Sequence, residues 1–231
     1  MFAIMSRCVI KADDFYATQS DRWLQFLLLC KQEGVPASLG FIAKRLRNGK
    51  TPHPRLVRLA KQPRFEVWNH GTEHWKDYTS GRSEFFGPAV ADQVASIERC
   101  QVLCEQVFGH RPKLFGPPFN AYDANTLRAL RQFPELEWLY DIAWLDGKTT
   151  LPKHYFVSCD VADSGRRFNP ERARKQSADF MIRRSPFVIQ IHPGNHWTDE
   201  CFVNFQIFLR YIQASGYRFV LPGRLFASKV I

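Results

Sequence analysis

The sequence of 231 residues lacks the features of a membrane, fibrous or signal-bearing protein. No apolar run approaches the ~18 uninterrupted residues of a transmembrane helix, and there is no internal repeat, low-complexity tract or linker. The opening segment Met1–Ile10 is too short and too interrupted for a signal peptide. We therefore expect one cytoplasmic domain over residues 1–231, and its 45% hydrophobic content suffices for a full core.

Cysteine does not occur in the arrangements that form zinc or redox motifs. The six cysteines are scattered, most of them inside apolar runs, and none forms a CxxC pair. Cys100 and Cys104 are one helical turn apart and could share a metal, but no second pair accompanies them. We therefore interpret the cysteines as reduced core thiols.

Acidic residues are too few to balance the basic ones, since 22 aspartates and glutamates face 32 lysines and arginines, a net charge of +10. This excess favours an anionic partner: a nucleotide-sugar, a lipid-phosphate-linked sugar, an acidic glycan or a nucleic acid. The basic residues are dispersed and lack the regular aromatic interleaving of an RNA-binding sheet. A nucleic acid is therefore not the expected partner, and the charge alone does not choose among the other anions.

Segments typical of strands and of helices alternate along the chain. Strands are expected over 7–11, 35–41, 65–68, 113–115, 138–144, 187–191 and 218–221, and helices over 21–31, 54–61, 88–108, 123–132 and 199–214. Ser20 is the expected cap of the first helix, and Gly34 ends it. This alternation predicts an α/β protein with a mainly parallel sheet or barrel and helices outside it.

Four polar motifs each follow an expected strand directly. They are Asp13-Asp14, His70–His74, Pro117–Asn120 and His192. An Asp-Asp pair alone is more often a turn or a helix cap, and a histidine before Pro-Gly can simply cap a turn. In a closed parallel barrel, however, the carboxyl ends of the strands converge on the face where active sites are built. The four motifs are therefore expected to be neighbours.

The spacing of His70 and His74 is typical of a metal site. Histidines at i and i+4 share one face of a helical turn and can reach one ion. With Asp14 from another strand end they form a two-histidine, one-carboxylate set, which suits Zn²⁺, Co²⁺, Fe²⁺, Mn²⁺ or Ni²⁺. Such an ion activates water and polarises a carbonyl. Asp13 would then serve as general base, and His192 would protonate a leaving amine.

In this order the motifs resemble those of the polysaccharide deacetylases, metal-dependent carbohydrate esterases with a nodulation-type deacetylase domain. The family signature has an Asp-Asp motif, His-x-x-x-His, an Arg-x-Pro-Tyr-like loop and Leu-x-His. This chain has Lys11-Ala-Asp-Asp-Phe15, His70-Gly-Thr-Glu-His74, Phe115-Gly-Pro-Pro-Phe-Asn120 and Ile189-Gln-Ile-His192. The resemblance covers roughly residues 7 to 226, and its strength lies in the order of the four motifs.

The resemblance implies a distorted (β/α) barrel, usually of seven strands. It also implies a divalent metal, with Zn²⁺ expected first, held by Asp14, His70 and His74, with Asp13 as base and His192 as acid. The loop of Pro118, Phe119 and Asn120 would face substrate, and the Phe119 amide would be the oxyanion donor because the prolines have no N–H. The implied reaction removes an N-acyl group, acetyl or formyl, from an amino sugar or glycan, at a C–N bond other than a peptide bond.

Several positions depart from the family pattern. Gly116 occupies the place of the arginine that normally holds the base carboxylate, and Lys11, Arg111 and Arg166 are candidate replacements. Gln190 replaces an apolar residue before the acid. The aspartate that usually supports His192 could be any of Asp141, Asp160 and Asp163. These departures suggest a divergent branch, like deacetylases encoded with surface-glycan or lipopolysaccharide genes.

Two other interpretations fit parts of the sequence. The segment His70-x-x-Glu73-His74 matches the inverted zinc-peptidase motif, in which Glu73 would be the base. That motif needs a long helix, and Gly71 opposes one because glycine costs a helix interior ~1 kcal/mol. The second alternative is a catalytically impaired sugar-binding module on the same fold. It is suggested by Gly116, which stands where the family has the arginine that holds the base.

Overall fold

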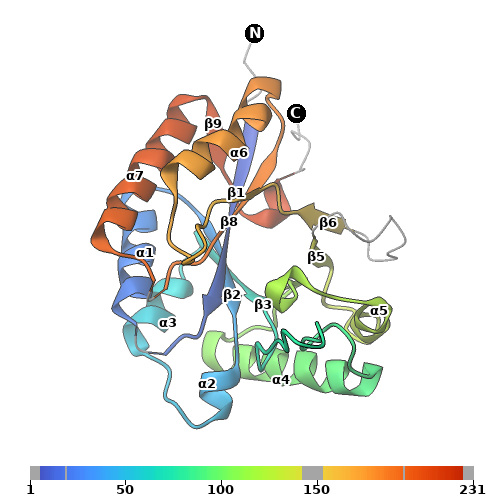
Figure 1. The fold of residues 1–231 in the computed structure, drawn as a ribbon. Coiled ribbons are helices and arrows are strands. Elements are labelled where there is room, and N and C mark those ends of the chain that lie inside the picture. Colours follow the sequence, from blue (N-terminus) through green and yellow to red (C-terminus); the bar gives the residue numbers. More distant parts are fainter. Residues whose placement is uncertain (1–5, 19, 142–152, 195, 226–231) are drawn as a thin grey trace, which may run out of the picture.

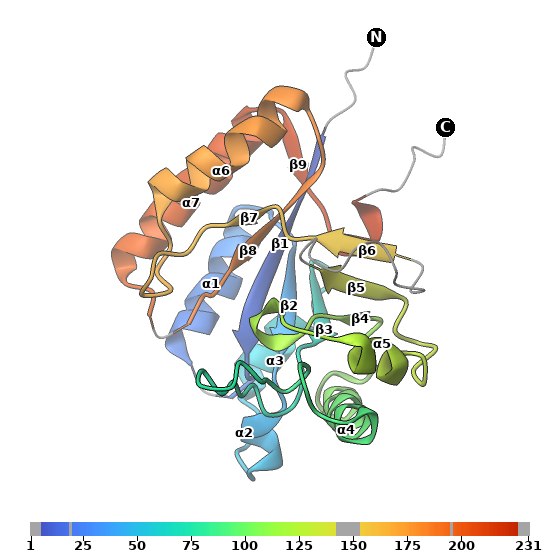
Figure 2. The same ribbon diagram turned by 45° about the vertical axis from the view of Figure 1, so that its right-hand side comes forward.

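The computed structural model describes residues 6–18, 20–141, 153–194 and 196–225. The chain alternates between strands and helices, with the helices outside a curled sheet (Figures 1 and 2). The end of the strand predicted over 138–144 lies outside the described residues. Within the described part of the chain, none of the helices combines the length and the apolar character needed to span a bilayer.

All pairings in the sheet are parallel. Its strands are β1 (Ser6–Phe15), β2 (Ala37–Phe41), β3 (Phe65–Asn69), β4 (Leu114–Phe115), β5 (Trp138–Asp141), β6 (Lys153–Phe156), β7 (Cys159–Asp160), β8 (Phe187–Ile191) and β9 (Tyr217–Phe219). They follow the order β6-β5-β4-β3-β2-β1-β8-β7, and β9 pairs with the first residues of β1. The predicted α/β fold with a parallel sheet is confirmed.

Strands β6 and β7 bring the two ends of the sheet together. β6 pairs with β5, and β7 pairs with β8 at the other end of the strand order. Only Val157 and Ser158 separate them, and their amides donate to the carbonyls of Asp141 at 2.9 Å and Val188 at 3.0 Å. The pair therefore acts as one bent strand. Counted in this way, and with β9 set apart because it pairs only with the start of β1, seven strands form a distorted barrel, as the family resemblance implied.

Helices cover the outer surface of this barrel (Figures 1 and 2). They are α1 (Asp21–Gln32), α2 (Lys44–Arg47), α3 (Pro54–Ala60), α4 (Val90–Phe108), α5 (Ala124–Leu130), α6 (Pro170–Arg183) and α7 (Asp199–Ala214). Helix α1 begins where predicted, because the Ser20 side chain accepts a hydrogen bond from the Trp23 amide. It ends before Gly34, whose φ of +66° is readily adopted only by glycine.

Helix α6 was not predicted, nor were the short segments α2, β6 and β7. Within α6 only Ala173 and Ser177 are buried, so the helix lacks the broad apolar stripe on which the sequence prediction relied. Its start was nevertheless marked. The Asn169 side chain accepts a hydrogen bond from the Arg172 amide at 2.8 Å, and Pro170 occupies the first turn.

Alternation along the strands fills the barrel interior in two layers. Side chains two residues apart share one face of a strand, so Val9, Lys11 and Asp13 of β1 point the same way. Val9 packs with Trp68 and Tyr140 in an apolar cluster that also contains residues of β4 and β8. Lys11 and Asp13 lie beyond that cluster, toward the carboxyl ends of the strands. The apolar layer thus forms the floor of a polar site.

Candidate metal centre and active site

A β-bulge at the end of β1 places two adjacent carboxylates in the same site. The pairing of β1 with β2 shifts register between Ala12 and Phe15, and Asp14 has a φ of +67°. Neighbouring residues of a regular strand point to opposite faces, so an unbent strand would direct Asp14 away from Asp13. The bulge and the left-handed backbone bring both carboxylates within 4.0 Å of His70 Nε2. The strand therefore extends past the Asp-Asp pair, which was expected just beyond its end.

His70 follows β3 and is held in one orientation by the loop after β4. Its Nδ1 lies 2.6 Å from the Gly116 carbonyl oxygen, which only accepts hydrogen bonds, so Nδ1 carries the proton. The lone pair of Nε2 is then directed to the site, where Asp14 Oδ1 lies 3.5 Å away. A carbonyl that fixes the tautomer of a histidine in this way is a common feature around metal ligands.

His74 reaches the site from a loop, and the helical turn expected from the i, i+4 spacing is wrong. Residues 70–75 contain no helix, and His74 has a φ of +51°. The buried Glu84 carboxylate organises the loop by accepting hydrogen bonds from the amides of Thr72 (2.7 Å), Glu73 (2.9 Å) and His74 (2.6 Å). It also accepts a hydrogen bond from the Ser96 hydroxyl. The Glu84 carboxylate thus satisfies three consecutive backbone amides that would otherwise need the hydrogen bonds of a helix.

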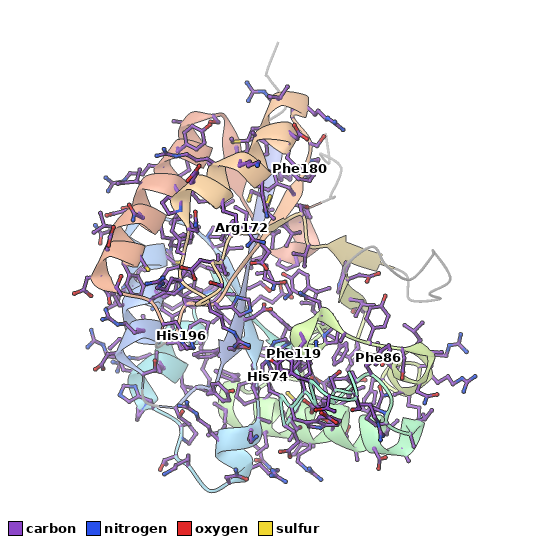
Figure 3. The ribbon with its side chains drawn as sticks, in the orientation of Figure 1. His74, Phe86, Phe119, Arg172, Phe180 and His196 are labelled. Atoms are coloured by element: carbon purple, nitrogen blue, oxygen red, sulfur yellow. The ribbon has the colours of Figure 1, made fainter. Side chains whose placement is uncertain are left out.

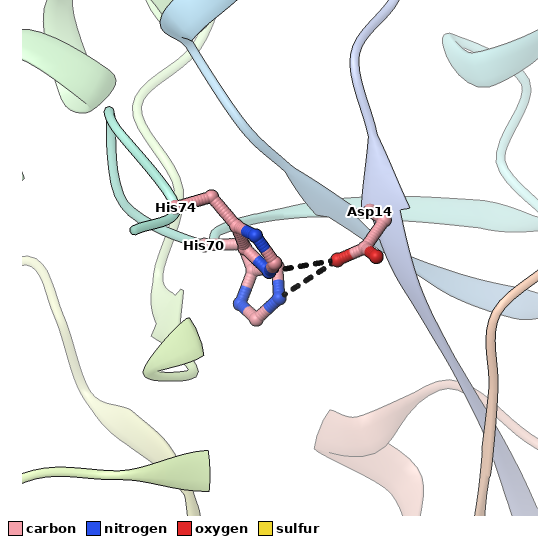
Figure 4. Close-up of side chains that lie close together, drawn as sticks. All are labelled: Asp14, His70 and His74. Atoms are coloured by element: carbon pink, nitrogen blue, oxygen red, sulfur yellow. Dashed lines mark ion pairs between the residues drawn. The ribbon is translucent and has the colours of Figure 1, made fainter. Parts of the chain in front are cut away.

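Asp14, His70 and His74 together offer three ligand atoms for one ion, and these atoms all lie within 4.8 Å of one another. Figure 4 shows both imidazole rings directed at the Asp14 carboxylate, with His74 Nε2 3.0 Å from Oδ1. That oxygen is buried and has no hydrogen-bond partner. Burial alone would raise the pKa of Asp14, but hydrogen bonding to and the positive charge of the two imidazoles, when they are protonated, outweigh it and hold the pKa well below its usual value. An ionised carboxylate facing two ring nitrogens fits a divalent cation.

Asp13 is held by Lys11, two residues earlier on the same face of β1. Lys11 is fully buried, and its Nζ forms an ion pair with Asp13 Oδ2 and donates to Gln190 Oε1 at 3.1 Å. The same ammonium lies 5.2 Å from the ring centroid of Trp68 and 5.4 Å from that of Tyr140. Of the three cations considered for the missing arginine, Lys11 is the one that contacts Asp13.

The other two cations have different partners. Arg111 forms ion pairs with Glu98, Glu105 and Glu135, away from the site. Arg166 donates to Asp14 Oδ2 at 3.2 Å, so it contacts the candidate metal ligand and not the base. Of the three candidates, Lys11 is thus the cation placed to hold the Asp13 carboxylate.

Trp68 explains why residue 116 is a glycine. A Cβ atom at Gly116 would lie 2.5 Å from Cζ3 of Trp68, and one at Gly40 would lie 2.6 Å from its Cζ2. The indole therefore fills the space that an arginine at residue 116 would need. The same ring contacts Lys11, so the glycine, the indole and the lysine pack together at one place in the barrel.

Gly116→Ala tests this packing. We expect the free energy of unfolding to fall by about 1–3 kcal/mol, the usual cost of overpacking a core. Gly223→Ala is the matched control, since a Cβ there has no atom within 4 Å. Urea unfolding of both variants would measure the difference, and equal stabilities would contradict the packing described for Trp68.

His192 lies directly beyond β8 and faces Asp13. Its Nε2 is 3.8 Å from Asp13 Oδ2, while its Nδ1 is buried with no hydrogen-bond partner. Burial lowers the pKa of His192 by more than Asp13 and Asp14 raise it. Among the proposed supporting aspartates, Asp160 is close enough to act on this pKa, whereas Asp163 binds Arg167.

The loop after β4 also borders the site. Phe119 and Asn120 both have left-handed backbones, with φ of +59° and +51°. The turn is closed by the amides of Asn120 and Ala121, which donate to the Pro117 and Pro118 carbonyls, so the Phe119 amide takes no part in closing it. The Phe119 ring packs on His74 with 4.6 Å between ring centroids, and Figure 3 shows the two side by side.

Asn120 connects this loop to β8. Its Nδ2 donates to Gln190 Oε1 at 3.0 Å, and its Oδ1 accepts from Lys11 Nζ at 3.4 Å. The structure thus brings all eight expected site residues to one end of the barrel. It adds Lys11, Glu84, Trp68 and Arg166, of which the sequence had pointed only to Lys11 and Arg166, as possible cations.

The chain is thus a parallel (β/α) barrel with a candidate Asp/His/His metal site at the carboxyl ends of its strands. This is the end of such barrels where active sites are built. The family model for polysaccharide deacetylase matches residues 7–134, more than half of the chain. The chain therefore belongs to the polysaccharide deacetylase family. No curated protein matches the sequence.

Solved structures share the fold at low sequence identity. A CE4 family pseudoenzyme from Bacillus anthracis is 12% identical with a TM-score of 0.66, and the match covers 96% of this chain and 66% of the pseudoenzyme. A peptidoglycan deacetylase from Bacillus subtilis is 17% identical, with a TM-score of 0.63 and coverage of 96% and 90%. A family 4 acetyl xylan esterase from Clostridium thermocellum, in complex with a cobalt ion, is 15% identical, with a TM-score of 0.62 and coverage of 95% and 90%.

Proposed function

We propose that this protein is a metal-dependent hydrolase that removes an N-acyl group from an amino sugar or glycan. The observation that carries the proposal is the convergence of Asp14, His70 and His74 on one point, with Asp13 and His192 beside it. Family membership supports the sugar as substrate. The cobalt complex of the acetyl xylan esterase supports a divalent ion, and zinc is the first expectation for this set of donors.

Asp14, His70 and His74 would hold the ion, which supplies an activated water and a polarised carbonyl when it is bound. Asp13 would accept the proton of the attacking water, since its Oδ2 faces the same space as His70 Nε2 and His192 Nε2. Its ion pair with Lys11 fixes the orientation of that carboxylate. Proton transfer is thereby assigned to a group that does not bind the ion.

His192 would donate the proton to the leaving amine. Its lowered pKa makes the protonated imidazole a stronger acid than an ordinary histidine, which favours transfer to an amine. The Phe119 amide would stabilise the negative charge that develops on the carbonyl oxygen. Asn120, linked to Gln190, would hold this loop in place against β8.

The structure offers little support for the peptidase alternative. Glu73 pairs with Arg47 at 3.1 Å, on the outside of the loop, and the segment is not helical. The pseudoenzyme neighbour motivates the second alternative, a sugar-binding module. Against it, this chain keeps the complete set of candidate ligands, base and acid, and Lys11 compensates for the lost arginine.

Acyl release from N-acylated sugars tests the proposal. We expect zinc-loaded protein to release acetate or formate and an equal amount of free amine from N-acylglucosamine oligosaccharides or phosphate-linked N-acyl sugars. Glu73→Gln should keep at least half of the activity, because Glu73 contacts surface arginines. A protein with metal bound that releases no acyl group from any of these sugars would contradict the hydrolase proposal, and inactivation by Glu73→Gln would favour the peptidase.

A further inference from the structure

A cavity of about 220 Å³ opens beside the candidate metal centre. Its walls include Asp14, Tyr16, Arg45, Arg166, His192 and His196. Figure 3 shows His196 at the end of the barrel where His74 also lies. Neither His70 nor His74 lines the cavity, so it adjoins the metal ligands on the Asp14 side. Pockets that enclose a drug-sized ligand have volumes of ~300–1,000 Å³, so this cavity suits one part of a larger substrate.

The charged groups of the cavity are mainly cationic. Among the described residues that line it, Asp14 is the only carboxylate, and it is already engaged by two imidazoles and Arg166. The Arg45 guanidinium lies 4.4 Å from the centroid of the Tyr16 ring and donates to the Thr18 hydroxyl at 3.2 Å. No carboxylate among the described residues pairs with Arg45. Its remaining donors are therefore available to an anion.

Arg166 is placed in the cavity by a short, constrained turn. Its φ of +61° lies in the left-handed region, which non-glycine residues adopt mainly where the surroundings impose it. Asp163 imposes it here by accepting hydrogen bonds from the amides of Gly165 at 2.8 Å and Arg167 at 2.9 Å. One Arg166 nitrogen contacts Asp14, the side chain is 42% exposed, and a guanidinium has five donors. Arg166 can thus hold Asp14 and a ligand together.

We propose that this cavity is a subsite for an anionic group, a phosphate or a carboxylate, on the sugar whose acyl group is removed. Arg45 and Arg166 would bind the group by the planar, two-point hydrogen bonding that guanidinium makes with such anions. The net charge of +10 would attract such a substrate. The proposal rests on the proposed function, and it narrows the substrate class from acylated amino sugars to those with a negative charge close to the acyl group.

Binding of three sugars without an acyl group tests the subsite in the absence of turnover. Zinc-loaded protein would be titrated calorimetrically with glucose 1-phosphate, glucuronate and glucose. We expect at least one anionic sugar to bind ten-fold or more tightly than glucose, and the stronger of the two identifies the anion. Arg45→Gln should reduce this preference about ten-fold, since a hydrogen bond to a charged group is lost.

Arg47→Gln is the matched control, because Arg47 lies on the same helix α2 and carries the same charge but pairs with Glu73 outside the cavity. It should leave the preference unchanged. The preference should also persist in metal-free protein. Equal affinities for all three sugars, equal effects of the two substitutions, or a preference found only with metal present would overturn the subsite.

The outcome is separable from that of the proposed function. Acyl release from neutral oligosaccharides without any preference for anionic sugars would remove the subsite and leave the hydrolase. A preference for anionic sugars that Arg45→Gln abolishes, in a protein that releases no acyl group, would support the subsite and remove the hydrolase.

Discussion

Replacing Asp13 by asparagine should lower the rate of acyl release by roughly 10²–10⁴-fold, the usual contribution of a positioned general base. Asparagine keeps the size of the side chain but cannot accept the proton at neutral pH. The metal content should be unchanged, because Asp14, His70 and His74 are not altered. Steady-state rates and metal analysis of the same preparation would measure both effects.

Asp179→Asn provides the control for this prediction. Asp179 is exposed on α6, and its substitution removes the same charge at a distance from the site. Activity within two-fold of the wild type is expected for it. If Asp13→Asn retained wild-type activity, Asp13 would not be the base. Its ion pair with Lys11 would then have no role in the reaction.

Replacing Lys11 by methionine should lower stability as well as activity. Lys11 and Asp13 are both buried, and removal of the lysine leaves a buried carboxylate without its cation. Breaking such a pair costs about 3–5 kcal/mol in free energy of unfolding. We also expect the rate of the folded protein to fall more than ten-fold, because Asp13 loses the contact that orients it.

The double variant Lys11→Met, Asp13→Leu separates the two effects. Replacement of a whole buried ion pair by apolar residues is often neutral or stabilising, so most of the lost stability should return. Activity should not return, since the base is absent. Urea unfolding and acyl release would be measured on all variants. A Lys11→Met protein with the stability and activity of the wild type would contradict the role assigned to Lys11.

The sequence was sufficient to predict the fold and the proximity of the candidate site residues. Clear apolar periodicity marked α1, α4 and α7, and the convergence of strand ends in a parallel barrel placed Asp13, His70 and His192 together. Helix α6 was missed because its buried face contains few apolar residues. The prediction therefore succeeded where a broad hydrophobic stripe or a strand end gave a signal.

The supports of the site could not be read from the sequence in the same way. Glu84 organises the His74 loop through three backbone amides, and nothing in residues 70–84 shows which carboxylate does so. The spacing of His70 and His74 was consistent with a helical turn, although a loop produces the same convergence. The contact of Lys11 with Asp13 could have been predicted, since the two-residue alternation of a strand puts both side chains on one face.

The exchange of arginine for lysine depends on packing in three dimensions. Gly116 indicates only that a side chain is missing, and its cause is a tryptophan from another strand, Trp68, which occupies the space. Such compensation between distant strands requires the register of the sheet. The departures from the family pattern are thus connected in the structure, although they are scattered in the sequence.

Metal analysis of the wild type beside Asp14→Ala and His70→Ala tests the central claim most directly. After incubation with zinc and removal of the excess, we expect close to one ion per chain in the wild type and at least a ten-fold lower content in each variant, because each loses one of three ligands. Asp179→Ala, at an exposed position on α6, should bind as much zinc as the wild type. Equal metal content in all four proteins would contradict the metal site and the mechanism built on it.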